Sequence, residues 1–243
     1  MTDDRTAIVS GAASGIGLAT ARRLAAQGWT LALVDLDAAA VKEAVDFPLE
    51  GHLVRATDIS DPDQVSGLFA QVEAELGPLK AVANVAGLTV VEDGRIEDVS
   101  LEVFDRVVGV NLRGNFLMCK GAIPALRAAG GGAIVNVGSV ASVLGTGGAA
   151  YVSSKHGLAG LTRQIAYRYA AENIRCSLVC PGPTDTPMIA IARAKGTVPA
   201  APGAIPRDVT ADEVASFIAY LVGDDAAMVT GSVHVVDGGM SQH

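Results

Sequence analysis

The sequence predicts a single α/β domain in which a doubly wound parallel sheet of about seven strands is flanked by helices. Short β-branched, apolar runs alternate with longer helical patterns along the whole chain. Several of these runs are apolar almost throughout, which is typical of strands covered on both faces. The chain has 243 residues, enough for one large sheet with a sizeable core, and no linker or repeat divides it.

The alternation of strands and helices predicts right-handed crossovers and one parallel sheet. The expected strands are 6–10, 30–34, 52–56, 81–84, 133–137, 175–179 and 233–236. The expected helices include 17–27, 62–76, 101–128, 151–171 and 211–222. Residues 188–207 are rich in Ala, Pro and Gly and contain no acidic residue. We therefore expect a long loop at about 188–210 that serves as a substrate lid.

Composition excludes several classes of partner. Half of the residues are hydrophobic, yet no run of about 18 apolar residues lacks charges, so no membrane-spanning helix is expected. The net charge of −8 disfavours nucleic acid, because phosphate contacts need a basic face. The acidic N-terminal segment does not resemble a signal peptide. Cys119, Cys176 and Cys180 lack CxxC or metal-type spacing, so we expect buried thiols in a cytoplasmic protein.

A glycine-rich turn follows the first expected strand. Gly11, Gly15 and Gly17 have the spacing G-x3-G-x-G, with Ser14 and Ile16 between them. Such a turn lets the backbone approach a pyrophosphate, whose charge the following helix N-terminus favours. The spacing differs from G-x-G-x-x-G, so the turn by itself also fits a tight strand-to-helix connection.

Asp35 follows the second strand, about 20 residues after the glycine turn. A carboxylate at this position accepts hydrogen bonds from the adenosine ribose and repels a 2′-phosphate. No Lys or Arg lies within 11–17 or directly after Asp35, so the sequence favours NAD over NADP. The alternative is that Asp35 caps the helix that starts near Asp37.

Asp58 and Ile59 follow the third strand. The Asp58 carboxylate is placed to meet the adenine amino group. The alternative role is to cap the helix that starts near Pro62, although Asp61 is better placed for that.

Tyr151 and Lys155 lie four residues apart at the start of one expected helix, and therefore on the same face. A free tyrosine has a pKa of about 10 and is a poor base at neutral pH. A neighbouring ammonium and a positive nicotinamide ring would stabilise the phenolate. Tyr151 would then take a proton from an alcohol or donate one to a carbonyl. Alone, this spacing also fits a surface lysine beside a packed tyrosine.

Two further polar residues precede this pair. Ser139 lies just beyond the strand 133–137, at the sheet edge where ligands of parallel sheets bind, and can hold a substrate oxygen. Its alternative role is a turn or cap. Asn111 lies inside the expected helix 101–128, where asparagine is unfavourable. Either it bonds backbone groups near Lys155, directly or through water, or it marks a local irregularity of the helix.

Together these motifs resemble the short-chain dehydrogenases/reductases, a family with a Rossmann-type fold, over essentially the whole chain. The resemblance rests on Gly11, Gly15 and Gly17; Asn84-Val85-Ala86-Gly87; Asn111, Ser139, Tyr151 and Lys155; Pro181-Gly182-Pro183-Thr184-Asp185-Thr186; and Val236-Asp237-Gly238-Gly239. Val85 replaces a second asparagine and removes a possible polar contact. The resemblance implies cofactor contacts at Asn84, Ala86, Gly87, Tyr151, Lys155, Pro181, Gly182, Thr184 and Thr186.

The resemblance also implies a mechanism of hydride transfer between nicotinamide C4 and the carbon of a small alcohol or carbonyl substrate. In it, Tyr151 is the general acid/base, and Lys155 lowers its pKa and holds the nicotinamide ribose. Ser139 polarises the substrate oxygen, and Asn111 anchors a water relay. The implied assembly is a homotetramer that pairs helices 101–128 and 151–171 and uses the carboxyl-terminal strand in a second interface.

Three other kinds of protein are less consistent with these motifs. A catalytically silent dinucleotide sensor or scaffold on the same fold would be expected to lack part of the tetrad. A serine hydrolase would need a G-x-S-x-G elbow, which the sequence lacks. A metal enzyme would need clustered histidines, whereas the histidines of this chain are scattered. Within the same class, a 3-oxoacyl thioester reductase is the alternative. Arg193, Lys195 and Arg207 of the lid either attract an anionic substrate or belong to a solvated loop.

Overall fold

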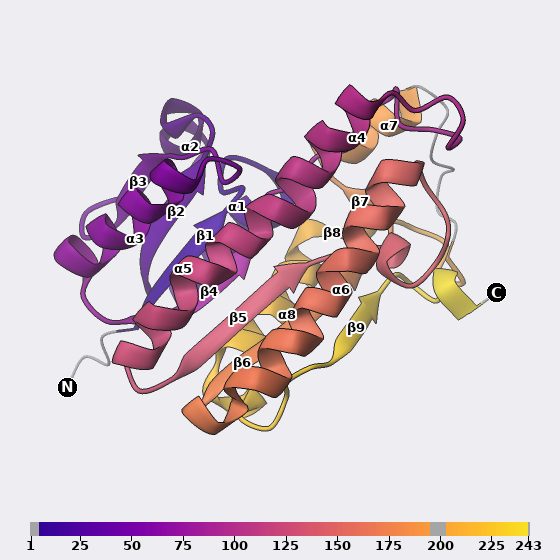
Figure 1. Ribbon diagram of the computed structural model, residues 1–243. Coiled ribbons are helices and arrows are strands. Elements are labelled where there is room, and N and C mark those ends of the chain that lie inside the picture. The colour runs from indigo at the N-terminus through magenta and orange to yellow at the C-terminus, as the bar shows by residue number, and fades with distance from the viewer. Residues whose placement is uncertain (1–4, 195–202, 243) are drawn as a thin grey trace.

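The computed structural model describes residues 5–194 and 203–242 and contains a seven-stranded parallel sheet between two layers of helices (Figure 1). The strand order is β3-β2-β1-β4-β5-β6-β9, and all neighbours are parallel. The strands are β1 (Thr6–Ser10), β2 (Thr30–Asp35), β3 (Leu53–Ala56), β4 (Leu79–Asn84), β5 (Gly132–Val137), β6 (Ile174–Pro181) and β9 (Val233–Val236). The predicted doubly wound sheet is confirmed; β1 and β9 have the predicted bounds, and the other strands differ from theirs by one or two residues at an end.

Helices cover both faces of this sheet. One face is covered by α1 (Gly15–Ala26) and α8 (Ala211–Val222), which pack against each other. The other is covered by α3 (Pro62–Leu76), α5 (Asn115–Ala128) and α6 (Ala149–Tyr169), the last two in front of the sheet in Figure 1. The short α2 (Ala38–Ala44) follows β2. No helix among the described residues is long and apolar enough to cross a bilayer.

Alternation along the strands creates two apolar cores. In β1, Ala7 and Val9 face the layer that contains Leu24 of α1 and Ile218 of α8. Ile8 points to the opposite face, where the side chains of α3 and α5 pack. Because both faces are buried, β1 is apolar along most of its length, which explains why the sequence pattern identified it.

The predicted helix 101–128 is divided into three parts. It consists of α4 (Leu101–Val108), a π-helical turn (Gly109–Gly114) that contains Asn111, and α5. The local irregularity that was one interpretation of Asn111 is therefore present.

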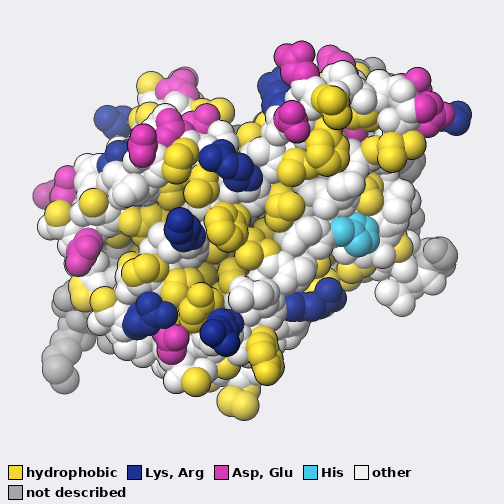
Figure 2. All heavy atoms as spheres, in the orientation of Figure 1, with side chains coloured by type: hydrophobic (Ala, Val, Ile, Leu, Met, Phe, Trp, Pro, Cys, Tyr) yellow, Lys and Arg dark blue, Asp and Glu magenta, His cyan; other side chains and the backbone are white. Residues whose placement is uncertain are grey.

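In Figure 2, hydrophobic side chains gather along α4 and α5 on the face toward the viewer.

The lid is not a loop throughout, and that prediction was wrong at its start. Residues Pro187–Ala194 form helix α7, with Pro187 at the first helical position, where its fixed φ suits a helix. The Ala-, Pro- and Gly-rich average over 188–207 concealed this short helical run. A two-stranded pair, β7 (Thr184–Asp185) and β8 (Val209–Thr210), joins the two ends of the lid. Residues 195–202 of the predicted lid, including Lys195, lie outside the described residues.

Candidate active site

The carboxyl ends of the strands meet at one edge of the sheet, where the chain order reverses between β1 and β4. Two cavities of about 640 Å³ and about 290 Å³ lie at this edge. They share the wall residues Ile16, Val85, Gly87, Leu88, Thr186 and Met188. A ligand in the larger cavity can therefore reach into the smaller one.

The glycine turn lines the larger cavity and needs glycine for steric reasons. Gly11 and Gly15 have positive φ angles of 72° and 52°. A Cβ atom on Gly17 would lie 1.9 Å from the Gly11 carbonyl oxygen. The Ser14 side chain makes no capping hydrogen bond to α1. The turn thus forms a backbone cradle at a helix N-terminus, which fits the diphosphate of a dinucleotide.

Asp35 lines the larger cavity at the end of β2. Its Oδ2 accepts a hydrogen bond from the Ala13 amide at 3.0 Å, and its Oδ1 accepts one from Leu36 at 2.8 Å. Asp37, not Asp35, is the N-cap of α2, so the alternative role of Asp35 as a helix cap was wrong.

Asp58 and Ile59 also line the larger cavity. Asp58 Oδ1 accepts hydrogen bonds from the amide and hydroxyl of Ser60, while Asp61 caps α3 as expected. Arg113 lines the same cavity and donates to the Ser60 carbonyl. The sequence did not indicate Arg113, because it comes from a distant helix.

The loop after β4 is supported by Ser10, a buried residue that the sequence analysis did not identify. Its Oγ accepts hydrogen bonds from the amides of Val85 and Ala86, both at 3.1 Å, so Val85 does not leave the loop unsupported. A polar residue at the end of the apolar strand β1 was the available signal. Asn84 is buried and donates to Asn136 Oδ1 at 2.9 Å. It lines neither cavity, so its position differs from the cofactor contact that was predicted for it.

Asn111 bonds backbone groups as well as marking the helix irregularity. Its Oδ1 accepts from the Leu88 amide at 2.8 Å, and its Nδ2 donates to the Leu88 carbonyl at 2.9 Å. A Cβ atom on Gly87 would lie 3.2 Å from Asn111 Oδ1 and 3.5 Å from Lys155 Nζ. Both interpretations of Asn111 therefore hold: it lies in the π-helical turn, and it bonds the backbone of Leu88, the residue after Gly87, which lies near Lys155.

Tyr151, Lys155 and Ser139 come together in the smaller cavity. Lys155 Nζ lies 5.6 Å from the centre of the Tyr151 ring and donates to the Val137 carbonyl at 2.9 Å. The Ser139 hydroxyl accepts a hydrogen bond from the Ala141 amide at 3.2 Å and, like Tyr151, lines this cavity. Ser139 therefore has the cap role that was its alternative interpretation, and its position in this cavity leaves the contact with a substrate oxygen as a prediction.

Burial dominates the acid–base properties of this group. It raises the pKa of Tyr151, and the hydrogen bond with Ser139 opposes the rise. It lowers the pKa of Lys155 to about 8. In the polypeptide itself, therefore, the pKa of Tyr151 is raised, because burial disfavours the phenolate. The lowering expected from the Lys155 ammonium together with a bound nicotinamide stays a prediction.

Apolar side chains and the proline-glycine segment form the remaining walls of the smaller cavity. These include Pro181, Gly182, Thr184, Leu88, Val90, Val140, Ile189 and Met240. Asp93 also lines it, and its carboxylate accepts hydrogen bonds from the amides of Ala150 and Tyr151. The sequence did not indicate Asp93 as a site residue, because Asp-Gly at 93–94 predicts only a turn.

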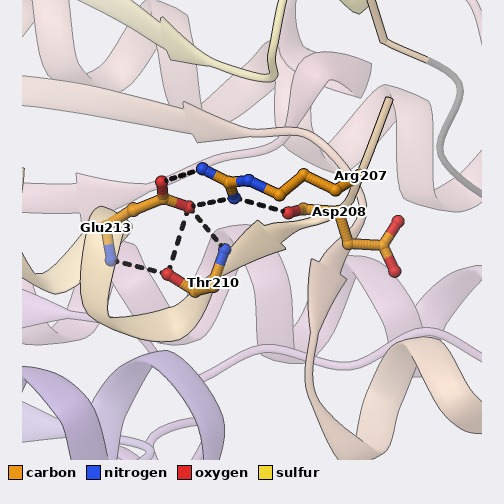
Figure 3. Close-up of polar contacts among 4 residues, drawn as sticks. All are labelled: Arg207, Asp208, Thr210 and Glu213. Atoms are coloured by element: carbon orange, nitrogen blue, oxygen red, sulfur yellow. Dashed lines mark hydrogen bonds and ion pairs between the residues drawn. The ribbon is translucent and has the colours of Figure 1, made fainter. Parts of the chain in front are cut away.

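The lid arginines are paired with acidic side chains. Arg193 binds Asp208 with two guanidinium nitrogens. Arg207 binds Glu213, which also forms a capping box with Thr210 at the start of α8 (Figure 3). The interpretation of Arg193 and Arg207 as attractants for an anionic substrate does not hold at these two positions, because neighbouring carboxylates neutralise them.

Comparisons with known proteins cover nearly the whole chain. A family model described as enoyl-(acyl carrier protein) reductase matches residues 11–241. The chain is 37% identical to 2-(R)-hydroxypropyl-CoM dehydrogenase of Xanthobacter autotrophicus, over 96% of this chain and 97% of that protein. It is also 37% identical to cyclohexanol dehydrogenase of Acinetobacter sp., over 97% of this chain and 94% of that protein. The solved structure of a short chain dehydrogenase from Mycobacterium paratuberculosis bound to NAD matches this chain with a TM-score of 0.91 and 26% sequence identity. The match covers 100% of this chain and 99% of that one.

Proposed function

We propose that this chain, which belongs to the short-chain dehydrogenase/reductase family and is an oxidoreductase that acts on secondary alcohols, uses NAD(H) as its cofactor. In this proposal Tyr151 is the general acid/base, and the substrate is a small alcohol or ketone. One observation carries this proposal. The larger cavity, with the glycine turn and Asp35, shares a wall with the smaller cavity, which contains Ser139, Tyr151 and Lys155. A dinucleotide and a substrate carbon can therefore meet at that wall.

The larger cavity would hold the adenosine and diphosphate parts of the cofactor. Gly11, Ser14, Gly15, Ile16 and Gly17 would receive the diphosphate at the start of α1, where backbone amides and the helix dipole favour negative charge. Asp35 would accept hydrogen bonds from the ribose, and Asp58 and Ile59 would contact adenine. The nicotinamide end would contact Ala86, Gly87, Pro181, Gly182, Thr184 and Thr186.

The cofactor, when bound, supplies or accepts the hydride, and the side chains manage the proton. The Tyr151 hydroxyl would donate a proton to a substrate carbonyl oxygen, or accept one from an alcohol. The Ser139 hydroxyl would hold the same oxygen. Lys155 would bind the nicotinamide ribose and supply the positive charge that favours the phenolate, and Asn111 would hold Leu88 and a water relay.

A panel of secondary alcohols and ketones, followed by NADH absorbance, tests this function directly. Small cyclic and acyclic alcohols are expected to be oxidised, since the smaller cavity has a volume of about 290 Å³ and mostly apolar walls. A 3-oxoacyl thioester belongs in the same panel as the alternative substrate class. Binding of NAD without turnover of any member would instead favour a silent dinucleotide sensor.

Asp35 is expected to set the preference for NAD. In the wild type, kcat/KM with NAD should exceed that with NADP by at least about a hundredfold, because the carboxylate repels a 2′-phosphate. Asp35→Ser should lower kcat/KM for NAD by about tenfold and reduce the preference, since it removes a charged acceptor. Asp37→Ser is the matched control, because serine can still cap α2. Equal efficiency of the wild type with both cofactors would contradict the assignment.

We also propose a homotetramer in which α4, α5 and α6 pair with a second copy. Large apolar side chains are exposed along these helices, including Phe104 and Phe116. Met228 and Val235 are exposed near the carboxyl-terminal strand, where a second interface would lie. Size-exclusion chromatography with light scattering should give about four times 24.6 kDa, and Phe116→Glu should release smaller species. A monomeric wild type would refute the assembly.

A further inference from the structure

The segment between β4 and α4 contacts the start of the helix that carries Tyr151. Asp93 Oδ1 accepts a hydrogen bond from the Ala150 amide at 2.9 Å, and Oδ2 accepts one from the Tyr151 amide at 2.7 Å. The neighbouring carbonyl of Gly94 accepts one from Ala149 at 3.0 Å. The two Asp93 contacts join residues 57 and 58 positions apart, so they depend on the fold.

These contacts take the place of a local helix cap. Gly148 is the N-cap residue of α6 and makes no side-chain capping bond. The first N–H groups of a helix have no partner within the helix, and a carboxylate is favoured there by the helix dipole. Asp93 and Gly94 together receive the consecutive amides of residues 149–151. A Cβ atom on Gly148 would lie 2.2 Å from Asp93 Cγ, so glycine at position 148 makes room for the carboxylate.

The same segment forms a wall of the smaller cavity. Leu88, Val90 and Asp93 all line it. Asn111 holds Leu88 at one end of the segment with two hydrogen bonds, and Asp93 attaches the other end to α6. The cavity wall and the Tyr151 backbone are therefore connected through one side chain.

We propose that Asp93 is a positioning residue for the reaction. Its carboxylate fixes the backbone of Tyr151 at the start of α6 and attaches the substrate-facing segment 88–94 to that helix. The inference rests on the proposed role of Tyr151. It matters for rate because proton transfer requires the phenol at hydrogen-bonding distance from the substrate oxygen, and a displacement of about 1 Å can cost about a hundredfold.

Asp93→Asn in the full-length protein tests the proposal. Asparagine keeps the shape and one acceptor oxygen, but its NH2 group would face one of the two helix amides. We expect kcat to fall by about tenfold to a hundredfold, while the KM for NAD stays within about twofold of the wild type. Asp93→Ala should lower kcat further. Glu92→Gln is the matched control, because this exposed neighbour loses the same charge and lines neither cavity, and its kcat should remain at the wild-type value.

Amide hydrogen exchange provides a second measurement that needs no turnover. Exchange at Ala150 and Tyr151 should accelerate in Asp93→Asn and stay unchanged in Glu92→Gln. This result stands even if Tyr151→Phe retains activity, so failure of the proposed function can be told apart from failure of the Asp93 contact. Unchanged kcat and exchange would overturn the proposal. Loss of NAD(H) binding or folding in Asp93→Asn would also overturn it, in favour of a purely structural role.

Discussion

Replacement of Tyr151 by phenylalanine is expected to lower kcat by about a hundredfold to ten-thousandfold, the usual contribution of a general acid/base. The substitution removes only the hydroxyl that would exchange a proton with the substrate oxygen. The ring remains, so the packing at the start of α6 should be kept. NAD(H) binding, measured by fluorescence titration, should stay close to that of the wild type, because most of the larger cavity is built by other segments.

A second tyrosine on the same helix provides the control for this variant. Tyr167 lies on α6 and is 89% exposed, so Tyr167→Phe removes a hydroxyl remote from both cavities. Its kcat should equal that of the wild type. If Tyr151→Phe turned over the alcohol at a near-normal rate, Tyr151 would not be the acid/base, and the proposed mechanism would be abandoned.

Lys155→Met is expected to remove both activity and a specific pH dependence of stability. Burial lowers the pKa of Lys155 from 10.5 to about 8 in the folded protein. Between these two pH values the unfolded chain binds more protons than the folded one, so the free energy of unfolding rises with pH. Burial of the charged Lys155 ammonium destabilises the folded protein fully below pH 8, and this cost disappears as the pH approaches 10.5. Lys155 should therefore contribute a rise of roughly 3 kcal/mol across this window in the wild type.

Urea unfolding at several pH values between 7 and 10.5 measures this contribution. In Lys155→Met the rise should be smaller by that amount, and kcat should fall by at least about a hundredfold. The Val137 carbonyl also loses its donor, at a pH-independent cost of about 1–3 kcal/mol, so the slope and not the absolute stability is compared. Lys42→Met, at an exposed position on α2, should leave the slope unchanged. An unaltered slope in Lys155→Met would contradict the buried ammonium.

Much of the fold could be predicted because its signals are local. Thr6–Ser10, Pro62–Leu76, Ala211–Val222 and Val233–Val236 have the predicted bounds. Strand and helix periodicities are properties of neighbouring residues, as is the steric need for glycine in the turn before α1. Local signals were weaker where two structures compete within a few residues. The π-helical turn around Asn111 and the helix α7 are such cases, because an average composition does not resolve a single turn.

The sequence by itself therefore determined the sheet, the glycine turn, and the order in which Asn111, Ser139, Tyr151 and Lys155 appear. Only the tertiary structure decided which groups hold them. Ser10 supports the loop 75 residues away, and Asp93 caps the helix of Tyr151 across 58 residues. Arg193 and Arg207 are neutralised, and burial sets the pKa of Tyr151. The physical reason is that partner choice and desolvation depend on which distant segments meet, and spacing along the chain does not record that.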